Sequence, residues 1–288
     1  MRSLLLVAAT DRPGLDAALA SAADVAILDL ADLVAPEAKA EARGAMVACL
    51  AAQASNPARP RLYVRINGFS SGFADLDLDA AVAAGAEGIV LPRAGGGPDV
   101  TRLDAKIAVA EAIHGIPDGR TRIVASVAET AHGVFQVGSH RGASHRLAGL
   151  VWDPEALARD LGAAATRAPD GTLHDAFRQA RTATLLGAVA AEVVAIDAAW
   201  TGAADGLVAD CTAAARDGFT AKLAVHPGQV AAINAAFTPS PAAVAEAAAV
   251  VEAFRASGGT GAVAFRGRSL ERPQLMRALA TLARAGRS

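Results

Sequence analysis

The chain has 288 residues, of which 53% are hydrophobic and only 19% are charged, and its formal net charge is -2. This length suits one α/β barrel or two small domains, and the apolar content is sufficient for a large core. Acidic and basic residues are interleaved along the chain, which argues against a nucleic-acid partner or an anionic membrane surface.

Two further features bear on the compartment. The two cysteines, Cys49 and Cys211, make no disulfide framework, which favours a reducing environment. The apolar run at the N-terminus ends at Asp11 and Pro13, too early for an export signal or a membrane span. We therefore expect a soluble, cytoplasmic protein.

Eight short apolar runs alternate with alanine-rich amphipathic segments, and each run is typical of a strand buried on both faces of a parallel sheet. The expected strands are residues 3–8, 24–30, 61–66, 87–92, 122–128, 147–152, 192–197 and 222–226. Helices are expected between them, for example over residues 36–54, 100–115 and 174–191.

Eight strands separated by helices fit a (β/α)8 TIM barrel better than an open doubly wound sheet. A dinucleotide-binding fingerprint would favour the open sheet, but no GxGxxG follows the first strand. The glycine-rich RAGGGPDV at 93–100 lacks the fingerprint spacing and is expected to be a loop.

The segment after the eighth strand is too long for one more strand–helix unit. TPSP predicts a turn and a helix start, and residues 261–286 predict a short strand, a polar turn and a last helix. We therefore expect a barrel over 1–228 and a C-terminal helical extension over 229–288 that packs on the barrel or on a neighbouring subunit.

In a barrel, catalytic groups come from the C-terminal ends of strands and from the loops that follow them. This rule selects Asp29, Asp32, Arg65, Asn67, Arg93, Glu129, Asp153, Glu155, Asp197 and His226.

Three of these acids could share a metal ion. Glu129 follows the fifth strand and Asp153 and Glu155 follow the sixth, so they could face one ion. Two carboxylates and several waters are the usual ligands of Mg²⁺. The alternative for Asp153 is an N-cap, because Pro154 suits the first position of a helix.

Several segments, in order along the chain, resemble citrate lyase β-subunit-like proteins of the HpcH/HpaI aldolase superfamily, which includes malyl-CoA and related CoA-ester lyases. They are RSLLLVAATDRPG, ILDLADLVAPEAKAEAR, LYVRING, GIVLPR, VAETAHGV, GLVWDPEALARDLGA, GFTAKLAVHPGQVAAINAAFTPS and GRSLERPQLMRA. The resemblance covers nearly the whole chain and is most specific in KLAVHPGQ and INAAFTPSP. It implies a TIM barrel with a C-terminal extension, assembled as homotrimers or hexamers.

The resemblance also implies a chemistry, the reversible cleavage of a hydroxyacyl-CoA or hydroxy acid into a keto acid and an acyl product. Mg²⁺ is the implied cofactor and acts as a Lewis acid, while the CoA thioester is a substrate. Glu129 matches the metal-binding glutamate, and Arg65 matches the arginine that binds the substrate carboxylate. Asp32 matches the second acid of an LED motif. Glu271 matches the acid of the extension that handles the proton on the thioester α-carbon.

Three positions depart from the family pattern. Ala156 stands at the position of the metal-binding aspartate, and Ala31 at that of the LED glutamate. Glu271 replaces an aspartate and is one methylene longer. Asp153 or Glu155 could supply the carboxylate oxygen that residue 156 lacks.

Two arginines are candidates for binding the phosphates of CoA. Arg12 and Arg93 both lie near the expected barrel mouth, and ordinary solvated arginines are the alternative for each. Three functions stay open: a CoA-ester lyase, an aldolase that acts on a free keto acid, and a barrel that has lost this chemistry. The last would bind a small acid or CoA ester, or serve a partner subunit.

Overall fold

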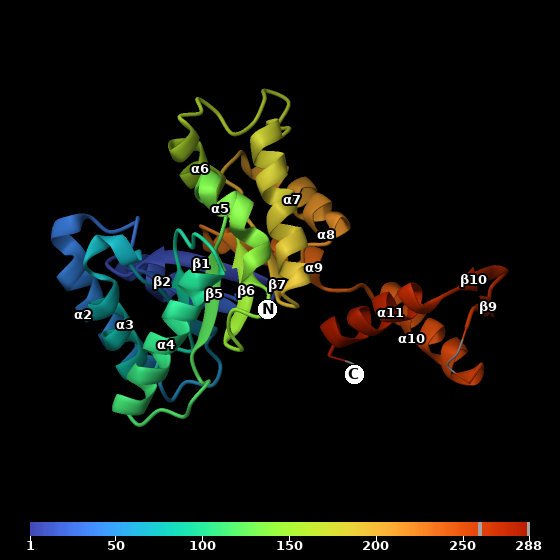
Figure 1. The fold of residues 1–288 in the computed structure, drawn as a ribbon, viewed down its shortest axis with the longest axis horizontal. Helices are drawn as coiled ribbons and strands as arrows, with labels where there is room; N and C mark the ends of the chain where they lie inside the picture. Colours follow the sequence, from blue (N-terminus) through green and yellow to red (C-terminus); the bar gives the residue numbers. More distant parts are fainter. Residues whose placement is uncertain (259–260, 287–288) are drawn as a thin grey trace. The chain divides into compact units, whose positions relative to one another are not determined.

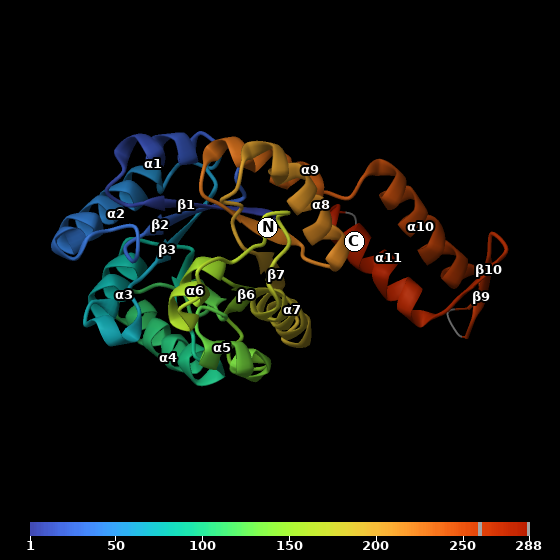
Figure 2. The ribbon, with the colours of Figure 1, turned by 90° about the horizontal axis from the view of Figure 1, so that it is seen from above.

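The computed structural model describes residues 1–258 and 261–286, and the chain divides into two compact units. The first is Met1–Asn234 and the second is Ala235–Ser288. In the first unit a ring of strands is surrounded by helices (Figures 1 and 2).

The eight strands of the first unit form a closed parallel barrel in sequence order, in which β8 pairs back on β1. They are β1 Ser3–Ala8, β2 Val25–Asp29, β3 Arg61–Arg65, β4 Gly88–Leu91, β5 Arg122–Ser126, β6 Leu147–Val151, β7 Val194–Asp197 and β8 Ala221–Ala224. The predicted TIM barrel is confirmed, and each predicted strand end lies within two residues of the observed one.

Helices connect successive strands around the barrel. They are α1 Arg12–Leu19, α2 Lys39–Gln53, α3 Ala74–Ala83, α4 Gly97–Ile113, α5 Ala131–Gln136, α6 Pro154–Leu161, α7 Asp175–Ala190 and α8 Leu207–Asp217. A further helix, α9 Val230–Phe237, follows the last strand. Within the described part of the chain, no helix has the length and apolar character needed to cross a membrane.

The barrel interior is a packed apolar layer. It consists of Leu4, Val25, Ile27, Tyr63, Val90, Val124, Val151, Ile196 and Ala221. Tyr63 is the largest of these, and the neighbouring strand accommodates it with Gly88, where a Cβ would lie 2.5 Å from the ring atom Cε2 of Tyr63.

Polar residues follow the apolar layer along the strands. Because side chains of a strand alternate between its two faces, the residue two positions further along faces the same side. On β2, β3 and β5 these residues are Asp29, Arg65 and Ser126, and Asp153 has the same relation to β6. The strand pattern therefore brings four polar residues to the C-terminal mouth of the barrel.

Asp197, a strand-end candidate, has a structural role on the outer side of the barrel. It is buried and accepts hydrogen bonds from Trp152 Nε1 at 2.9 Å, Arg181 Nε at 3.0 Å and Lys222 Nζ at 3.0 Å. Burial works to raise the pKa of Asp197, but Lys222 and Arg181 together outweigh it and hold that pKa below its usual range. The carboxylate thus joins β7 and β8 to α7.

We expect Asp197→Asn to lower the free energy of unfolding by about 3–5 kcal/mol, because it removes one carboxylate from two largely buried cations. The melting temperature should fall by roughly 10 °C at neutral pH in calorimetry. Because the pKa of Asp197 is depressed in the folded state, its contribution is present above the ordinary aspartate range and is lost as pH falls. The difference between variant and wild type should therefore shrink in acid.

Asp217→Asn is the matched control for this prediction. Asp217 accepts from the same Arg181, at 2.7 Å from Nη1, but its side chain is partly exposed. Its replacement should cost no more than about 1 kcal/mol. Equal losses of stability in the two variants would contradict the structural role of Asp197.

The second unit is a helical hairpin with a short two-stranded sheet. Its elements are α10 Pro241–Ala256, β9 Val263–Phe265, β10 Arg268–Leu270 and α11 Arg272–Arg284. The sequence predicted one short strand before the last helix, whereas two strands pair antiparallel here. A small apolar core holds the unit together, formed by Ala247, Val250, Phe254, Val263, Leu270 and Ala278.

Candidate functional site

Arg65, the last residue of β3, lies at the centre of the candidate site. Its side chain is only 9% exposed, its Nη2 lies 2.6 Å from Asp32 Oδ2, and its Nε lies 3.7 Å from Asp29 Oδ1. Burial works to lower the pKa of Arg65, but Asp29, Glu129 and Asp32 together raise it above its ordinary value. The barrel mouth therefore holds a permanent, nearly buried guanidinium.

Asp32 links this guanidinium to the rim of the mouth. Its second oxygen, Oδ1, lies 2.9 Å from Arg93 Nη2, so one carboxylate bridges two arginines. Burial works to raise the pKa of Asp32, but Arg65 and Arg93 outweigh it and lower that pKa. Arg93 is half exposed and has a left-handed backbone, with φ of 51°. Asp32 thus holds Arg93 at the entrance.

Asp29 organises the loop that carries Asp32. It is fully buried and accepts from the backbone N–H groups of Ala31 at 3.1 Å and Leu33 at 2.7 Å. Burial raises the pKa of Asp29, and Arg65 only partly offsets this effect. Lys39 Nζ donates to the carbonyl of Ala31 at 2.7 Å. These contacts fix the loop, and with it the carboxylate that positions Arg65.

Glu129 is a buried carboxylate that lies near two arginines, Arg65 and Arg93. The residue is 2% exposed, and neither carboxylate oxygen has a hydrogen-bond partner among the described residues. The guanidinium of Arg93 lies close by, with its Nε 4.0 Å from Oε2. Burial raises the pKa of Glu129, and Arg65 opposes it. A buried carboxylate with two open oxygens is costly unless a cation or donor completes it.

Asp153 presents a second carboxylate to the same space. It is the N-cap of α6, and its Oδ1 accepts from the N–H groups of Glu155 at 2.9 Å and Ala156 at 3.1 Å. Both hydrogen bonds fall on Oδ1, which leaves Oδ2 for a ligand. The capping interpretation is therefore correct and is compatible with metal binding.

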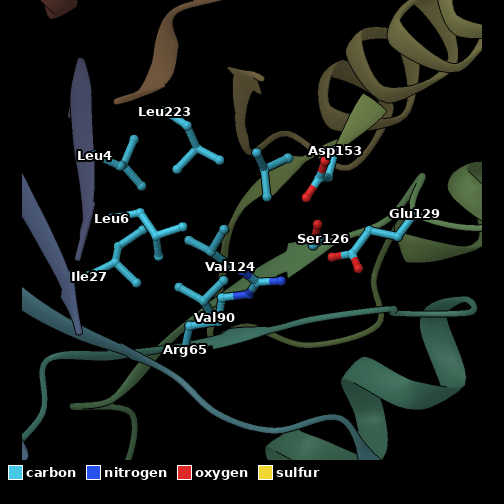
Figure 3. Close-up of a pocket in the computed structure, with 11 residues that line it drawn as sticks. Leu4, Leu6, Ile27, Arg65, Val90, Val124, Ser126, Glu129, Asp153 and Leu223 are labelled. Atoms are coloured by element: carbon cyan, nitrogen blue, oxygen red, sulfur yellow. The ribbon is translucent and has the colours of Figure 1, made fainter. Parts of the chain in front are cut away.

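One cavity of about 40 Å³ lies at the barrel mouth, beside Arg65, Glu129 and Asp153. Its polar side is formed by Arg65, Ser126, Glu129 and Asp153, whose polar atoms gather together in Figure 3. Its other lining residues are aliphatic: Leu4, Leu6, Ile27, Val90, Val124, Val151 and Leu223. The cavity thus combines one cation, two acids and an apolar wall.

The remaining predicted site residues lie elsewhere. Glu155 is exposed in the first turn of α6 and does not line the cavity, and Ala156 beside it is buried. Arg12 is exposed on α1 and pairs with Asp16 at 3.4 Å. Glu271 belongs to the second unit, where it precedes α11 and its N–H donates to Gln274 Oε1 at 3.0 Å.

Two more residues near the strand ends, Ser126 and His226, are placed by the structure. Ser126 was not predicted as a site residue, although its position two residues after Val124 indicates that it faces the barrel interior. His226 was a strand-end candidate, but its Nδ1 accepts from the N–H of Gly228 at 3.0 Å within the turn after β8. Strand alternation could have found the first, and the HPG turn sequence explains the second.

Comparison with known proteins agrees with this geometry. The family model described as HpcH/HpaI aldolase/citrate lyase matches residues 2–227. A citrate lyase subunit beta-like protein of Mycobacterium tuberculosis is 33% identical over 279 residues, which cover 96% of this chain and 93% of that protein. A (3S)-malyl-CoA thioesterase of Cereibacter sphaeroides is 31% identical over 288 residues, which cover 99% of this chain and 94% of that protein.

A solved structure is similar over the same extent. It is that of protein CitE from Mycobacterium tuberculosis in complex with magnesium, acetoacetate and coenzyme A. The TM-score is 0.76 at 31% sequence identity, with coverage of 99% of this chain and 98% of that one. The barrel, its site and these similarities lead to one conclusion: the chain belongs to the HpcH/HpaI aldolase/citrate lyase family, a family of enzymes.

Proposed function

We propose that this protein is a magnesium-dependent carbon–carbon lyase that cleaves a hydroxyacyl-CoA thioester into a 2-oxo acid and an acyl-CoA. The observation that carries the proposal is the cavity in which Arg65 lies with the Glu129 carboxylate, whose oxygens accept no hydrogen bond among the described residues, and with the Asp153 carboxylate. The similarity to L-malyl-CoA/beta-methylmalyl-CoA lyases and to a magnesium-containing relative supports the same activity.

The residues at the mouth fit a magnesium ion. Glu129 offers two buried oxygens without partners, and Asp153 offers Oδ2. Mg²⁺ is usually bound by one or two carboxylates and keeps several waters, so this donor set is sufficient. Asp153 would supply the oxygen that Ala156 cannot. When bound, Mg²⁺ would polarise the oxygen on the carbon where the bond breaks.

The proposed reaction requires no oxidant or reductant. The bond between the hydroxyl-bearing carbon and the thioester α-carbon breaks, and the hydroxyl loses its proton to become the keto group. The electron pair of the broken bond passes to the α-carbon, which forms a thioester enolate and then takes up a proton. Arg65 would hold the substrate carboxylate with its planar guanidinium, because Asp32 and Asp29 fix its orientation.

A separate acid is needed at the α-carbon, and Glu271 is our candidate because it matches the acid of the family's extension. Arg93, half exposed and fixed by Asp32, is the candidate for binding CoA phosphates, with exposed Arg12 as a second. In the family such extensions often act on a neighbouring subunit, so a homotrimer or hexamer is part of the proposal.

We expect Arg65→Lys to raise the KM for the 2-oxo acid by about 10–100-fold in the condensation direction. Lysine preserves the charge among the surrounding acids but cannot make the two-point contact of a guanidinium. The fold should survive, as checked by circular dichroism. Arg61→Lys is the control, because Arg61 begins the same strand and is exposed. Identical KM values for the two variants would contradict the role of Arg65.

One alternative has a specific observation in its favour. Ala31 and Ala156 replace family acids, and across residues 1–258 and 261–286 no group of three or more His, Cys, Asp or Glu side chains is placed to hold a metal. A barrel that has lost the chemistry would still bind a small acid or CoA ester. Lyase activity gained by Ala156→Asp from an inactive wild type would support this alternative. Saturable CoA binding separates the thioester lyase from an aldolase of free keto acids.

A further inference from the structure

A second cavity, of about 490 Å³, lies at the opposite end of the barrel from the mouth. Its lining includes Arg61 and Arg122, the first residues of β3 and β5, and Tyr63 on β3. All strands of a parallel barrel begin at the same end, and the two cavities share no lining residue. We call this space the basal cavity. Its volume lies within the range of about 300–1,000 Å³ that is typical of sites for small molecules.

The strand pattern turns both arginines toward the barrel axis. Arg61 comes two residues before Tyr63, Arg122 comes two residues before Val124, and both later residues belong to the interior layer. Alternate residues of a strand face the same side. Gly88 begins β4, between these two strands, and pairs in register with both Tyr63 and Arg122. Because a Cβ on Gly88 would lie 2.5 Å from Tyr63 Cε2, the glycine lets the tyrosine ring cover β4.

The two arginines of the basal cavity lack a counter-charge. Neither the guanidinium of Arg61 nor that of Arg122 makes a hydrogen bond or ion pair with a described residue. Arg59, two residues before Arg61, shows the usual arrangement, since its Nη1 lies 2.6 Å from Glu87 Oε2. Glu192 is the one acid among the described lining residues, and it is exposed and forms no ion pair with them. The cavity therefore has a surplus of positive charge, which attracts an anion.

The hydroxyl of Tyr63 provides an independent indication of a ligand. The residue is only 1% exposed and lines the basal cavity, yet its hydroxyl has no hydrogen-bond partner among the described residues. Burial raises the pKa of Tyr63, while Arg61 and Arg122 work against it. The hydroxyl is thus a neutral donor near both guanidinium groups. A buried hydroxyl without a partner is costly, and an acceptor bound in the cavity would complete it.

The number of donors favours a phosphate over a carboxylate. One guanidinium fork already engages both oxygens of a carboxylate. A phosphate group has three terminal oxygens and carries up to two negative charges, so it can accept from two guanidinium groups and a hydroxyl together. The aliphatic residues Leu147, Val193 and Val194 also line the cavity and leave room for a small organic body.

We propose that the basal cavity is a binding site for a phosphate group, either inorganic phosphate or a small phosphate monoester, held by Arg61, Arg122 and Tyr63. This site goes beyond the proposed lyase function. Because it lies at the other end of the barrel, a phosphate bound there leaves Arg65 and the acids of the mouth free.

The test is isothermal titration of the wild-type protein with inorganic phosphate, at neutral pH and without Mg²⁺. Acetate is the comparison for a single carboxylate, and glycerol 3-phosphate is the comparison for a monoester. We expect saturable binding of one phosphate per chain, at least about 10-fold tighter than acetate. Tighter binding of glycerol 3-phosphate than of phosphate identifies a monoester as the ligand, and the reverse identifies the free ion; both results support the site.

Three variants and a control locate the phosphate. Arg122→Gln should lower phosphate affinity by at least about 10-fold, and Tyr63→Phe, which keeps the ring over β4, by about 3–10-fold. Glu192→Gln removes a repelling charge and should raise the affinity by about 2–5-fold. Arg120→Gln is the matched control, because Arg120 lies two residues before Arg122 but is exposed and outside the lining. It should leave the affinity within about 2-fold of wild type.

Three outcomes overturn the site. The first is absence of phosphate binding by the wild-type protein, or binding no tighter than that of acetate. The second is an equal loss of affinity in Arg122→Gln and Arg120→Gln, which would show attraction by charge alone. The third is a loss in Arg93→Gln with none in Arg122→Gln, which would place the phosphate at the mouth.

Discussion

Asp153→Asn is expected to lower the affinity for Mg²⁺ by about 10–100-fold, and lyase kcat/KM with it, while the melting temperature hardly changes. Asparagine caps a helix as well as aspartate does, so the hydrogen bonds from the N–H groups of Glu155 and Ala156 should survive. What is lost is the carboxylate oxygen Oδ2, because the single oxygen of asparagine stays in the cap and the amide nitrogen that takes the place of Oδ2 does not bind a hard cation. Calorimetric titration with Mg²⁺ and thermal unfolding measure the two effects separately.

Glu155→Gln is the matched control, because Glu155 lies two residues away on the same helix but is exposed and outside the cavity. It should leave Mg²⁺ affinity within about 2-fold of wild type. A large loss of Mg²⁺ affinity in Glu155→Gln, with none in Asp153→Asn, would show that Glu155 rather than Asp153 supplies the oxygen that Ala156 lacks.

Glu129→Gln should have opposite effects on activity and on stability. The substitution removes a buried charge that accepts no hydrogen bond among the described residues, so the metal-free protein should gain about 1–3 kcal/mol and melt roughly 2–10 °C higher. Lyase activity should fall at least about 100-fold, since the loss of a charged ligand costs several kcal/mol of metal-derived stabilisation. The rise in melting temperature that Mg²⁺ gives the wild type should disappear.

Glu111→Gln provides the comparison for this variant. Glu111 is equally buried but completely paired, with Oε2 2.8 Å from Arg146 Nη1 and Oε1 2.7 Å from the N–H of Thr121. Its neutralisation should lower the melting temperature and leave Mg²⁺ binding unchanged. If Glu129→Gln also destabilised the metal-free protein, Glu129 would be a structural acid rather than an open ligand.

The fold was accessible from the sequence because each strand is a short continuous apolar run bounded by turns. Parallel strands buried on both faces give this pattern, and eight of them in alternation with helices favour a closed barrel. The position of Asp153 as an N-cap also followed from local chemistry, since Pro154 comes directly after it. The extra strand β10 was missed because Arg268–Leu270 is too short and polar to show a period.

The site was accessible only in part. The strand-end rule selected Arg65, Asp32 and Glu129, which the structure brings together, but it could not distinguish Asp153 from Glu155. That distinction depends on the direction of two side chains at the start of α6, one toward the cavity and one toward solvent. Ser126 was missed because a serine within an apolar strand has no motif of its own. Glu271 stays a prediction from the family resemblance.

The central claim is that Glu129 and Asp153 hold a magnesium ion on which a 2-oxo acid binds. Isothermal titration of the wild-type protein with Mg²⁺, in the presence and absence of pyruvate, tests it most directly. The account predicts saturable binding of one ion per chain, which pyruvate tightens. Absence of Mg²⁺ binding at millimolar concentration, with pyruvate present, would contradict it.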